Sequence, residues 1–252
     1  MGYLIIMFNE LKRILVKDGI KTPGYQQIFN NVIGYDDIKL LLYKMITSKY
    51  TNSVLLTGPP ASSKTVFILE LLDHFKGKAY FVDGTTASGM GVIDYLFDHT
   101  DLKFLLIDEI DKLNKKDQKV LLNVMETGIL SDVKAKRSKS ARQTHIHLSI
   151  YATSNDTSNI LTPLLSRFVK LSLPEYSLET FTEICQKLLS RKYDKDHETI
   201  QAIIRYVWEH TKDVREAIAI AKIAGTSDEV NSIASTLRRY SSEMTATNGR
   251  RP

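Results

Sequence analysis

The sequence predicts an α/β fold with a five-stranded parallel sheet, joined to a smaller all-helical domain. Strand patterns alternate with helix patterns from residue 53 to residue 173, which is typical of parallel strands linked by crossover helices. The strands are short, continuous apolar runs, as expected for strands that are buried on both faces. Past Pro174 the strand patterns stop, and helix patterns alone continue to about residue 240.

Each strand is predicted from a run of apolar, β-branched or aromatic residues that ends at a turn or loop signal. The predicted strands are residues 53–57, 79–83, 103–109, 147–155 and 168–173. Helices with apolar spacing are predicted at residues 65–75, within 88–99 and at 117–126. Four more helices are predicted at residues 175–191, 196–210, 213–224 and 227–240.

These patterns divide the chain into four expected parts. They are an N-terminal arm (1–25), an α/β domain (26–174), a helical domain (175–240) and a flexible tail (241–252). The arm is expected to contain a short helix from Phe8 to Val16, and the tail is polar throughout. A chain of 252 residues is long enough for one medium domain with a smaller companion.

The composition is that of an ordinary soluble protein, with 43% hydrophobic and 25% charged residues. No apolar run approaches the roughly 18 residues of a membrane-spanning helix, and the N-terminus lacks the features of a signal peptide. Cys185 is the single cysteine, which excludes internal disulfides and favours a reducing, cytoplasmic location. The formal net charge of +5 is compatible with an anionic partner.

The segment GPPASSKT, residues 58–65, follows the first predicted strand and precedes a predicted helix, which is the setting of a phosphate-binding loop. Lys64 would reach the β and γ phosphate oxygens, and Thr65 would offer its hydroxyl to Mg2+. Ala61 and Ser63 stand where glycine is common; if either needs a positive φ, the side chain costs roughly 1–2 kcal/mol. The residues expected to bind the nucleotide here are Gly58, Pro59, Pro60, Ala61, Ser62, Ser63, Lys64, Thr65 and Val66.

The segment FLLIDEID, residues 104–111, places carboxylates at the end of a buried strand. Ligands of open parallel sheets bind at the carboxyl ends of the strands, so Asp108 is a candidate for holding Mg2+, directly or through water. Glu109 is a candidate general base that polarises an attacking water. The alternative is that Asp-Glu merely ends a strand, but GPPASSKT about fifty residues upstream favours the nucleotide site.

These two segments belong to a longer series of motifs that resembles the AAA+ ATPases over residues 26–224. The series, in order, is VIGYDDIK, GPPASSKT, LLIDEID, ATSN, PLLSRF and KDVREAI. The resemblance implies an AAA+ P-loop NTPase core with a five-stranded parallel sheet and a C-terminal helical lid domain, which binds ATP or ADP with Mg2+. Because Lys64, Asp108 and Glu109 are all present, we expect an active ATPase rather than a degenerate one.

The resemblance also implies roles for residues outside the two nucleotide motifs. Ile33 and Gly34 would lay backbone against the adenine. Asn155 would position the attacking water, and Arg215 of the lid would turn toward the phosphates. Arg167 would be an arginine finger that reaches the nucleotide of a neighbouring subunit, which implies a ring, expected to be a homo-hexamer. Taken singly, these residues have ordinary alternatives, a turn asparagine and solvated surface arginines.

A basic segment lies between Asp132 and the fourth predicted strand. Its lysines and arginines are Lys134, Lys136, Arg137, Lys139 and Arg142. Alternation over residues 133–135 and 145–148 predicts two strands joined by this basic tip. The segment resembles the hairpin that marks the pre-sensor-1 superclass of AAA+ proteins, whose helicases contact DNA with it. We therefore expect nucleic-acid contact here; the alternative is a solvated basic loop.

The order of motifs is most similar to RuvB-like AAA+ proteins, the Holliday-junction branch-migration motors. Those motors continue into a winged-helix domain that grips DNA, whereas about 28 residues follow Ala224 here, so the expectation is that the DNA anchor is either absent or supplied by a protein partner. We therefore expect a Mg-ATP-dependent motor with helicase or branch-migration activity on DNA. A protein-remodelling ATPase and a clamp-loader-like switch stay open as alternatives; the lack of an aromatic residue before Met90 weakens the first.

Overall fold

The structure is a computed structural model that describes residues 24–87, 89–132 and 142–247. Residue contacts divide the chain into two compact units. We name them the α/β unit (Met1–Gly58 and Ser63–Leu173) and the helical unit (Pro59–Ser62 and Pro174–Pro252). The helix expected from Phe8 to Val16 lies outside the described residues.

The α/β unit is built on a parallel sheet with the strand order β2-β3-β6-β1-β7. Its strands are β1 (Val54–Thr57), β2 (Ala79–Asp83), β3 (Phe104–Asp108), β6 (Ser149–Ser154) and β7 (Val169–Ser172). The register pairs Asp83 with Asp108 and Thr57 with Ser154, so the carboxyl ends of the four strands that carry these residues meet at one edge. This confirms the five-stranded parallel α/β fold that the sequence predicts.

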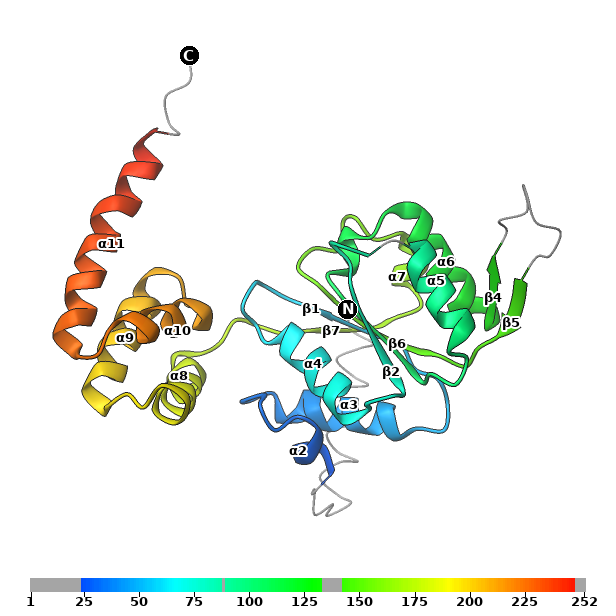
Figure 1. Cartoon of the computed structure of the whole chain (residues 1–252), viewed down its shortest axis with the longest axis horizontal. Coiled ribbons are helices and arrows are strands. Elements are labelled where there is room, and N and C mark those ends of the chain that lie inside the picture. Colours follow the sequence, from blue (N-terminus) through cyan, green and yellow to red (C-terminus); the bar gives the residue numbers. More distant parts are fainter. Residues whose placement is uncertain (1–23, 88, 133–141, 248–252) are drawn as a thin grey trace, which may run out of the picture. The chain divides into compact units, whose positions relative to one another are not determined.

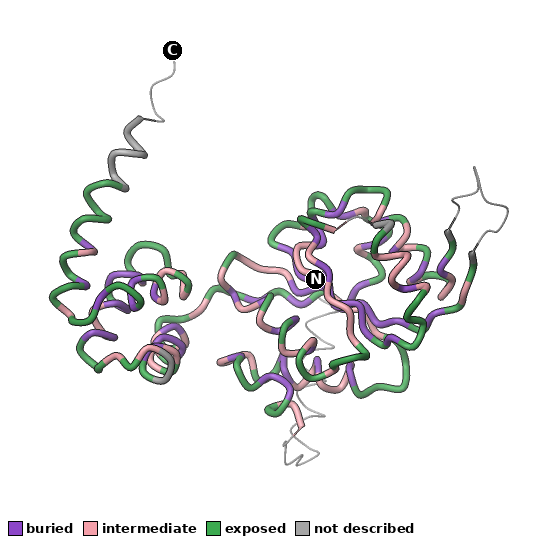
Figure 2. Tube along the Cα trace, viewed as in Figure 1, coloured by how far each residue is buried: buried purple, intermediate pink, exposed green. Residues whose placement is uncertain are grey.

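Helices cover both faces of this sheet (Figure 1). One face carries α2 (Gly24–Ile28), α3 (Asp36–Thr47) and α4 (Lys64–His74), and the other carries α5 (Gly89–Asp98), α6 (Lys115–Thr127) and α7 (Thr162–Leu165). Neighbouring residues of β1 serve the two cores in turn: Leu55 packs into one, Val54 and Leu56 into the other. The central strands are accordingly buried along their length (Figure 2), which explains their continuous apolar runs.

A separate antiparallel pair follows α6. Strand β4 (Ile129–Asp132) pairs with β5 (Arg142–His145), and its register sets Ile129 opposite His145. Both strands lie earlier in the sequence than the predicted segments 133–135 and 145–148. For β4 the reason is Gly128, which has φ 65°, ends α6 and turns the chain directly into the strand. The basic residues Lys134, Lys136, Arg137 and Lys139 lie outside the described residues, and only the backbone of Arg142 is described.

The helical unit contains α8 (Leu178–Tyr193), α9 (His197–His210), α10 (Val214–Ile223) and α11 (Ser227–Thr247). Side chains cap two of these helices: Ser177 accepts a hydrogen bond from the Thr180 amide at 3.2 Å, and Asp196 accepts one from the Thr199 amide at 2.8 Å. Helix α11 continues past residue 240, into the segment expected to be a flexible tail, because no glycine or proline occurs before Gly249.

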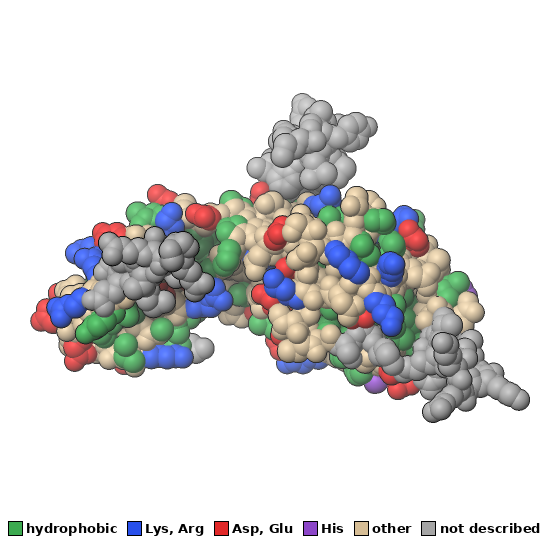
Figure 3. All heavy atoms as spheres, turned by 90° about the horizontal axis from the view of Figure 1, so that it is seen from above, with side chains coloured by type: hydrophobic (Ala, Val, Ile, Leu, Met, Phe, Trp, Pro, Cys, Tyr) green, Lys and Arg blue, Asp and Glu red, His purple; other side chains and the backbone are tan. Residues whose placement is uncertain are grey.

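The surface of the described part is that of a charged protein. Lys, Arg, Asp and Glu side chains are interspersed over the face drawn in Figure 3. Among the described residues, no helix is both long enough and apolar enough to cross a membrane.

Candidate functional site

The loop after β1 adopts the left-handed backbone at two non-glycine residues. Ala61 has φ 63° and Ser63 has φ 62°, and Gly58, with φ 149°, lies in a region that favours glycine. A side chain in the left-handed region costs roughly 1–2 kcal/mol. The loop therefore adopts, at Ala61 and Ser63, the left-handed backbone conformation that favours glycine. Helix α4 begins directly after it at Lys64.

Lys64 is nearly buried, with 6% of its surface exposed. Its Nζ donates a 2.9 Å hydrogen bond to the carbonyl oxygen of Gly58, so the ammonium group reaches back to the start of the loop. A buried ammonium is tolerated only when it is hydrogen-bonded or paired with an anion. The loop thus holds a positive charge beside its backbone, as a phosphate-binding site requires.

Thr65 and Asp108 join the loop to the end of β3. The Thr65 hydroxyl lies 3.1 Å from Oδ1 and 3.0 Å from Oδ2 of Asp108. A hydroxyl and a carboxylate are hard oxygen donors, and Mg2+ typically takes one or two such groups together with waters and phosphate oxygens. These two residues therefore fit the Mg2+ that the sequence analysis assigns to them.

Thr153 of β6 connects the two acidic residues and was missed by the sequence analysis. Its buried hydroxyl donates to Oδ1 of Asp108 and accepts a 3.0 Å hydrogen bond from the amide of Glu109. Glu109 itself has φ 52°, a left-handed backbone that turns the chain away from β3. Such strain persists only where its surroundings hold it. The available signal was the position of Thr153 at the end of a strand expected to end at the same edge.

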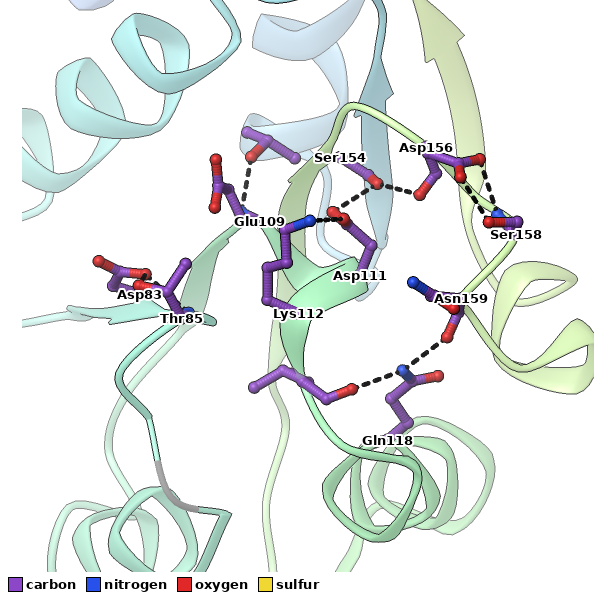
Figure 4. A network of polar contacts seen from close by, with 12 residues as sticks. Asp83, Thr85, Glu109, Asp111, Lys112, Gln118, Ser154, Asp156, Ser158 and Asn159 are labelled. Atoms are coloured by element: carbon purple, nitrogen blue, oxygen red, sulfur yellow. Dashed lines mark hydrogen bonds and ion pairs between the residues drawn. The ribbon is translucent and has the colours of Figure 1, made fainter. Parts of the chain in front are cut away.

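Gly84 is a second residue that sequence reasoning missed. A Cβ at this position would lie 2.3 Å from the carbonyl oxygen of Glu109 and 3.0 Å from that of Asp108. The Gly84 amide donates a 2.8 Å hydrogen bond to the same Asp108 carbonyl. Beside it, hydrogen bonds from the Thr85 hydroxyl and amide lower the pKa of the Asp83 carboxyl (Figure 4).

Asn155 follows β6 directly and is exposed. The residue before it, Ser154, is fully buried, and its hydroxyl, with a single proton to donate, lies 2.7 Å from Oδ1 of Asp111 and 2.6 Å from the carbonyl oxygen of Asp156. Asp111 is in turn 3.2 Å from Nζ of Lys112 (Figure 4). The turn that carries Asn155 is thereby fixed to the segment that follows Glu109.

Gln118 of α6 fixes the loop that follows Asn155 through hydrogen bonds to Asn159 and Leu161. The sequence pattern did not select this residue. Its fully buried amide nitrogen donates to the carbonyls of Leu113 at 2.9 Å and Asn159 at 3.0 Å. Its amide oxygen accepts a 2.8 Å hydrogen bond from the backbone of Leu161 (Figure 4 shows Gln118 and Asn159). Helix α6 therefore anchors the loop that runs from Asn155 toward Arg167.

The two predicted arginines have other partners. Arg167 is exposed and forms an ion pair with Glu126 near the end of α6. Arg215 belongs to the helical unit and pairs with Asp213 at 2.8 Å, and the hydrogen bonds that its guanidinium donates to the Asp213 carboxylate raise its pKa. Their assigned roles at the phosphates stay predictions.

The predicted adenine segment lies against the helix that follows the phosphate loop. Gly34 and Tyr35 have φ values of 73° and 56°, and the ring of Tyr35 lies 6.2 Å from that of Phe67 in α4. Ile33 is half-buried at the same turn. The adenine contact itself stays a prediction.

Comparison with known proteins agrees with these features. The family model described as AAA, the ATPase family associated with various cellular activities, matches residues 54–175. RuvB of Ehrlichia chaffeensis, a Holliday junction branch migration complex subunit, is 27% identical over 170 residues, or 64% of this chain and 51% of that protein. The DNA replication licensing factor mcm2 of Xenopus tropicalis is 29% identical over 148 residues, or 53% of this chain and 16% of that protein. The chain spans about half or less of the length of these curated relatives.

Solved structures share the fold. A RuvB variant from Thermotoga maritima has a TM-score of 0.66 at 20% identity, and the match covers 84% of this chain and 73% of that chain. The T. maritima RuvB structure described as a Holliday junction branch migration motor has a TM-score of 0.60 at 20% identity, with 81% and 70% covered.

Proposed function

We propose that this chain is an AAA ATPase that binds ATP with Mg2+ and hydrolyses it as a motor; the match of residues 54–175 to the AAA family model supports this. The observation that carries the proposal is the contact between Thr65 and Asp108, which joins the loop beside the buried Lys64 to the acidic end of β3. Phosphate-binding and acidic groups of a nucleotide hydrolase must meet in this way.

In this proposal each residue has one task. The loop amides and Lys64 hold the β and γ phosphates, and Thr65 and Asp108 hold the metal. Bound Mg2+ would neutralise charge on the phosphate oxygens. Glu109 accepts a proton from the attacking water, while the hydrogen bond from its amide to Thr153 keeps the carboxylate beside the strand ends.

We further propose that hydrolysis requires a ring, which we take to be a homo-hexamer. Arg167 is exposed at the surface of its protomer, where it could reach the nucleotide of a neighbour. Asn155 and Arg215 would respond to the γ-phosphate. Since an added arginine finger is worth about 10³ to 10⁵ in rate, isolated protomers should hydrolyse ATP slowly.

We propose DNA as the substrate, with a protein partner that anchors the motor on it. The support is the basic segment between β4 and β5 and the similarity to RuvB, whose name refers to Holliday junctions. The test is steady-state ATP turnover with single-stranded DNA, duplex DNA and a four-way junction, with Glu109→Gln as the blank. Stimulation that fades with salt supports a DNA motor. Turnover that is indifferent to every DNA would contradict it and favour protein remodelling.

A further inference from the structure

A groove of about 670 Å³ opens on the α/β unit at the edge where β3 and β6 begin. Lys103 and Phe104 line it at the start of β3, and Ser149 lines it at the start of β6. The candidate nucleotide site lies at the opposite, carboxyl ends of these strands, at Asp108 and Ser154. The groove is therefore a second site, separate from the phosphate loop.

The groove is basic. Its lining includes Lys49, Lys103, His74 and His147, and none of its described lining residues is acidic. Two acidic residues that lie close to His74 and Lys103 in the sequence already have partners. Asp73 pairs with Lys76 at 2.6 Å, and Asp101 pairs with Lys78 at 2.5 Å. The groove thus presents positive charge without a fixed counter-charge of its own, and such a surface favours an anionic ligand.

The groove is also aromatic. Tyr50 is 69% exposed, the highest value among the large hydrophobic side chains of the described part, and Nζ of Lys49 lies 5.1 Å from the centre of its ring. Tyr43 and Phe75 line the same space half-buried and Phe104 lines it from the core, so Tyr50 is the ring that is open for stacking. Exposed rings interleaved with cations are the means by which proteins bind single strands, since bases stack on the rings while the cations face the phosphates.

We propose that this groove binds single-stranded nucleic acid. Duplex DNA keeps its bases stacked on one another, whereas an unpaired base can enter the space beside Tyr50 and leave its phosphates near Lys49 and Lys103. The groove supplies a contact on each motor subunit in addition to the basic segment after β4. The binding proposed for this groove depends only on the residues that line it, and it requires neither ATP nor a ring.

The competing occupant is the chain's own N-terminal segment. Gly24, the first described residue after residues 1–23, lines the groove, and a Cβ there would lie 2.4 Å from Oη of Tyr43. That segment contains the apolar run YLIIMF, but its four basic residues (Lys12, Arg13, Lys17 and Lys21) outnumber its two acids (Glu10 and Asp18), so it would add net positive charge to a surface that is already basic. Charge complementarity therefore favours a nucleic acid over this segment.

Fluorescence anisotropy of a labelled oligothymidylate, titrated with the full chain in the absence of ATP, tests the proposal. The groove variant carries Lys49→Glu and Lys103→Glu, and a matched control carries Lys170→Glu and Lys222→Glu, two exposed lysines elsewhere with the same change of charge. We expect the groove variant to bind at least about tenfold more weakly and with a shallower salt dependence, and the control to change less than about threefold. Tyr50→Ala should weaken binding about fivefold or more through lost stacking.

Cross-linking of the unsubstituted chain to an oligonucleotide that contains iodouracil gives a second measurement that does not depend on the variants' folding. Cross-links to peptides that contain Tyr50 or Phe75 support the proposal. Cross-links only to peptides that contain neither Tyr50 nor Phe75, or equal binding by the groove variant and wild type, would overturn it. A groove occupied by residues 1–23 would give the same two results. ATP turnover without DNA, measured in parallel, separates this proposal from the ATPase, because either can fail while the other holds.

Discussion

Arg167 and Glu126 form an ion pair within one protomer, between the segment before β7 and the end of α6. The side chains are 47% and 37% exposed, and ion pairs between exposed groups contribute only about 0.2–1 kcal/mol. The contact is therefore weak enough to break when a stronger anion comes within reach of Arg167. In the proposed ring, the γ-phosphate bound to a neighbouring subunit would be such an anion.

We predict that Arg167→Ala lowers ATP turnover of the assembled protein by about 10³-fold or more, because the finger would be missing from every site. Arg205→Ala, an exposed arginine of α9, is the control and should leave turnover unchanged. Mixing Arg167→Ala with Glu109→Gln should restore part of the activity, since a mixed ring contains sites with both groups. Full turnover in Arg167→Ala alone, or no restoration on mixing, would contradict a role in trans.

Thr153→Val should lower kcat about 10- to 100-fold, which is the usual effect of removing a partner that orients a metal ligand. The valine keeps the shape of the side chain but removes the hydroxyl that contacts both Asp108 and Glu109. Thr144→Val in β5 is the matched control. Steady-state kinetics and urea unfolding, measured on both variants, separate the catalytic effect from a loss of stability of about 1–3 kcal/mol. A normal kcat in Thr153→Val would mean that the hydroxyl does not position the acidic pair.

Gly84→Ala should lower both the free energy of unfolding, by about 1–3 kcal/mol, and the ATP turnover. The new Cβ would meet the backbone carbonyl of Glu109 at 2.3 Å, so the turn that carries this proposed general base must move. Gly225→Ala is the control, because its Cβ would meet only the end of the flexible Glu229 side chain at 3.3 Å. Urea denaturation and turnover measurements check both effects. Wild-type values for Gly84→Ala would show that this close approach is not needed.

The stability of the protein should fall above pH 9 through Cys185. Burial raises the pKa of this thiol from 9.0 to about 12, so the folded chain keeps the proton where the unfolded chain releases it. Between these values the unfolded state binds fewer protons, and the free energy of unfolding decreases by up to about 1.4 kcal/mol per pH unit from this group. Urea unfolding as a function of pH, compared with Cys185→Ala, isolates the effect because the alanine variant lacks this slope. Parallel curves would contradict the predicted shift.

The central strands β1, β3 and β6 were predictable because burial on both faces leaves a continuous apolar run in the sequence. The edge strands β2 and β7 are only partly buried, yet residues 79–83 form a strand with the bounds that were predicted. The position of β4 was not predictable, because it depends on the left-handed turn at Gly128 rather than on alternation in the basic segment. From the sequence, only the cost of a positive φ at Ser63 could be stated, not its occurrence, because the residue type alone does not determine φ.

The residues of the candidate site also fall into those that the sequence predicts and those that it does not. Lys64, Thr65, Asp108 and Glu109 occur in local motifs, so pattern alone selects them. Thr153, Gly84 and Gln118 act through contacts between segments that are distant along the chain, such as the 2.8 Å hydrogen bond from the Leu161 amide to Gln118. Such contacts depend on strand order and on loop course, which become known only with the fold.

The most direct test of the account is steady-state ATP turnover with Mg2+ by the full chain and by Glu109→Gln. The account predicts Mg2+-dependent turnover in the wild type that falls at least about 10²-fold in the variant, the lower limit for losing a general base. Equal turnover in the two proteins, or none in either at any protein concentration, would contradict it.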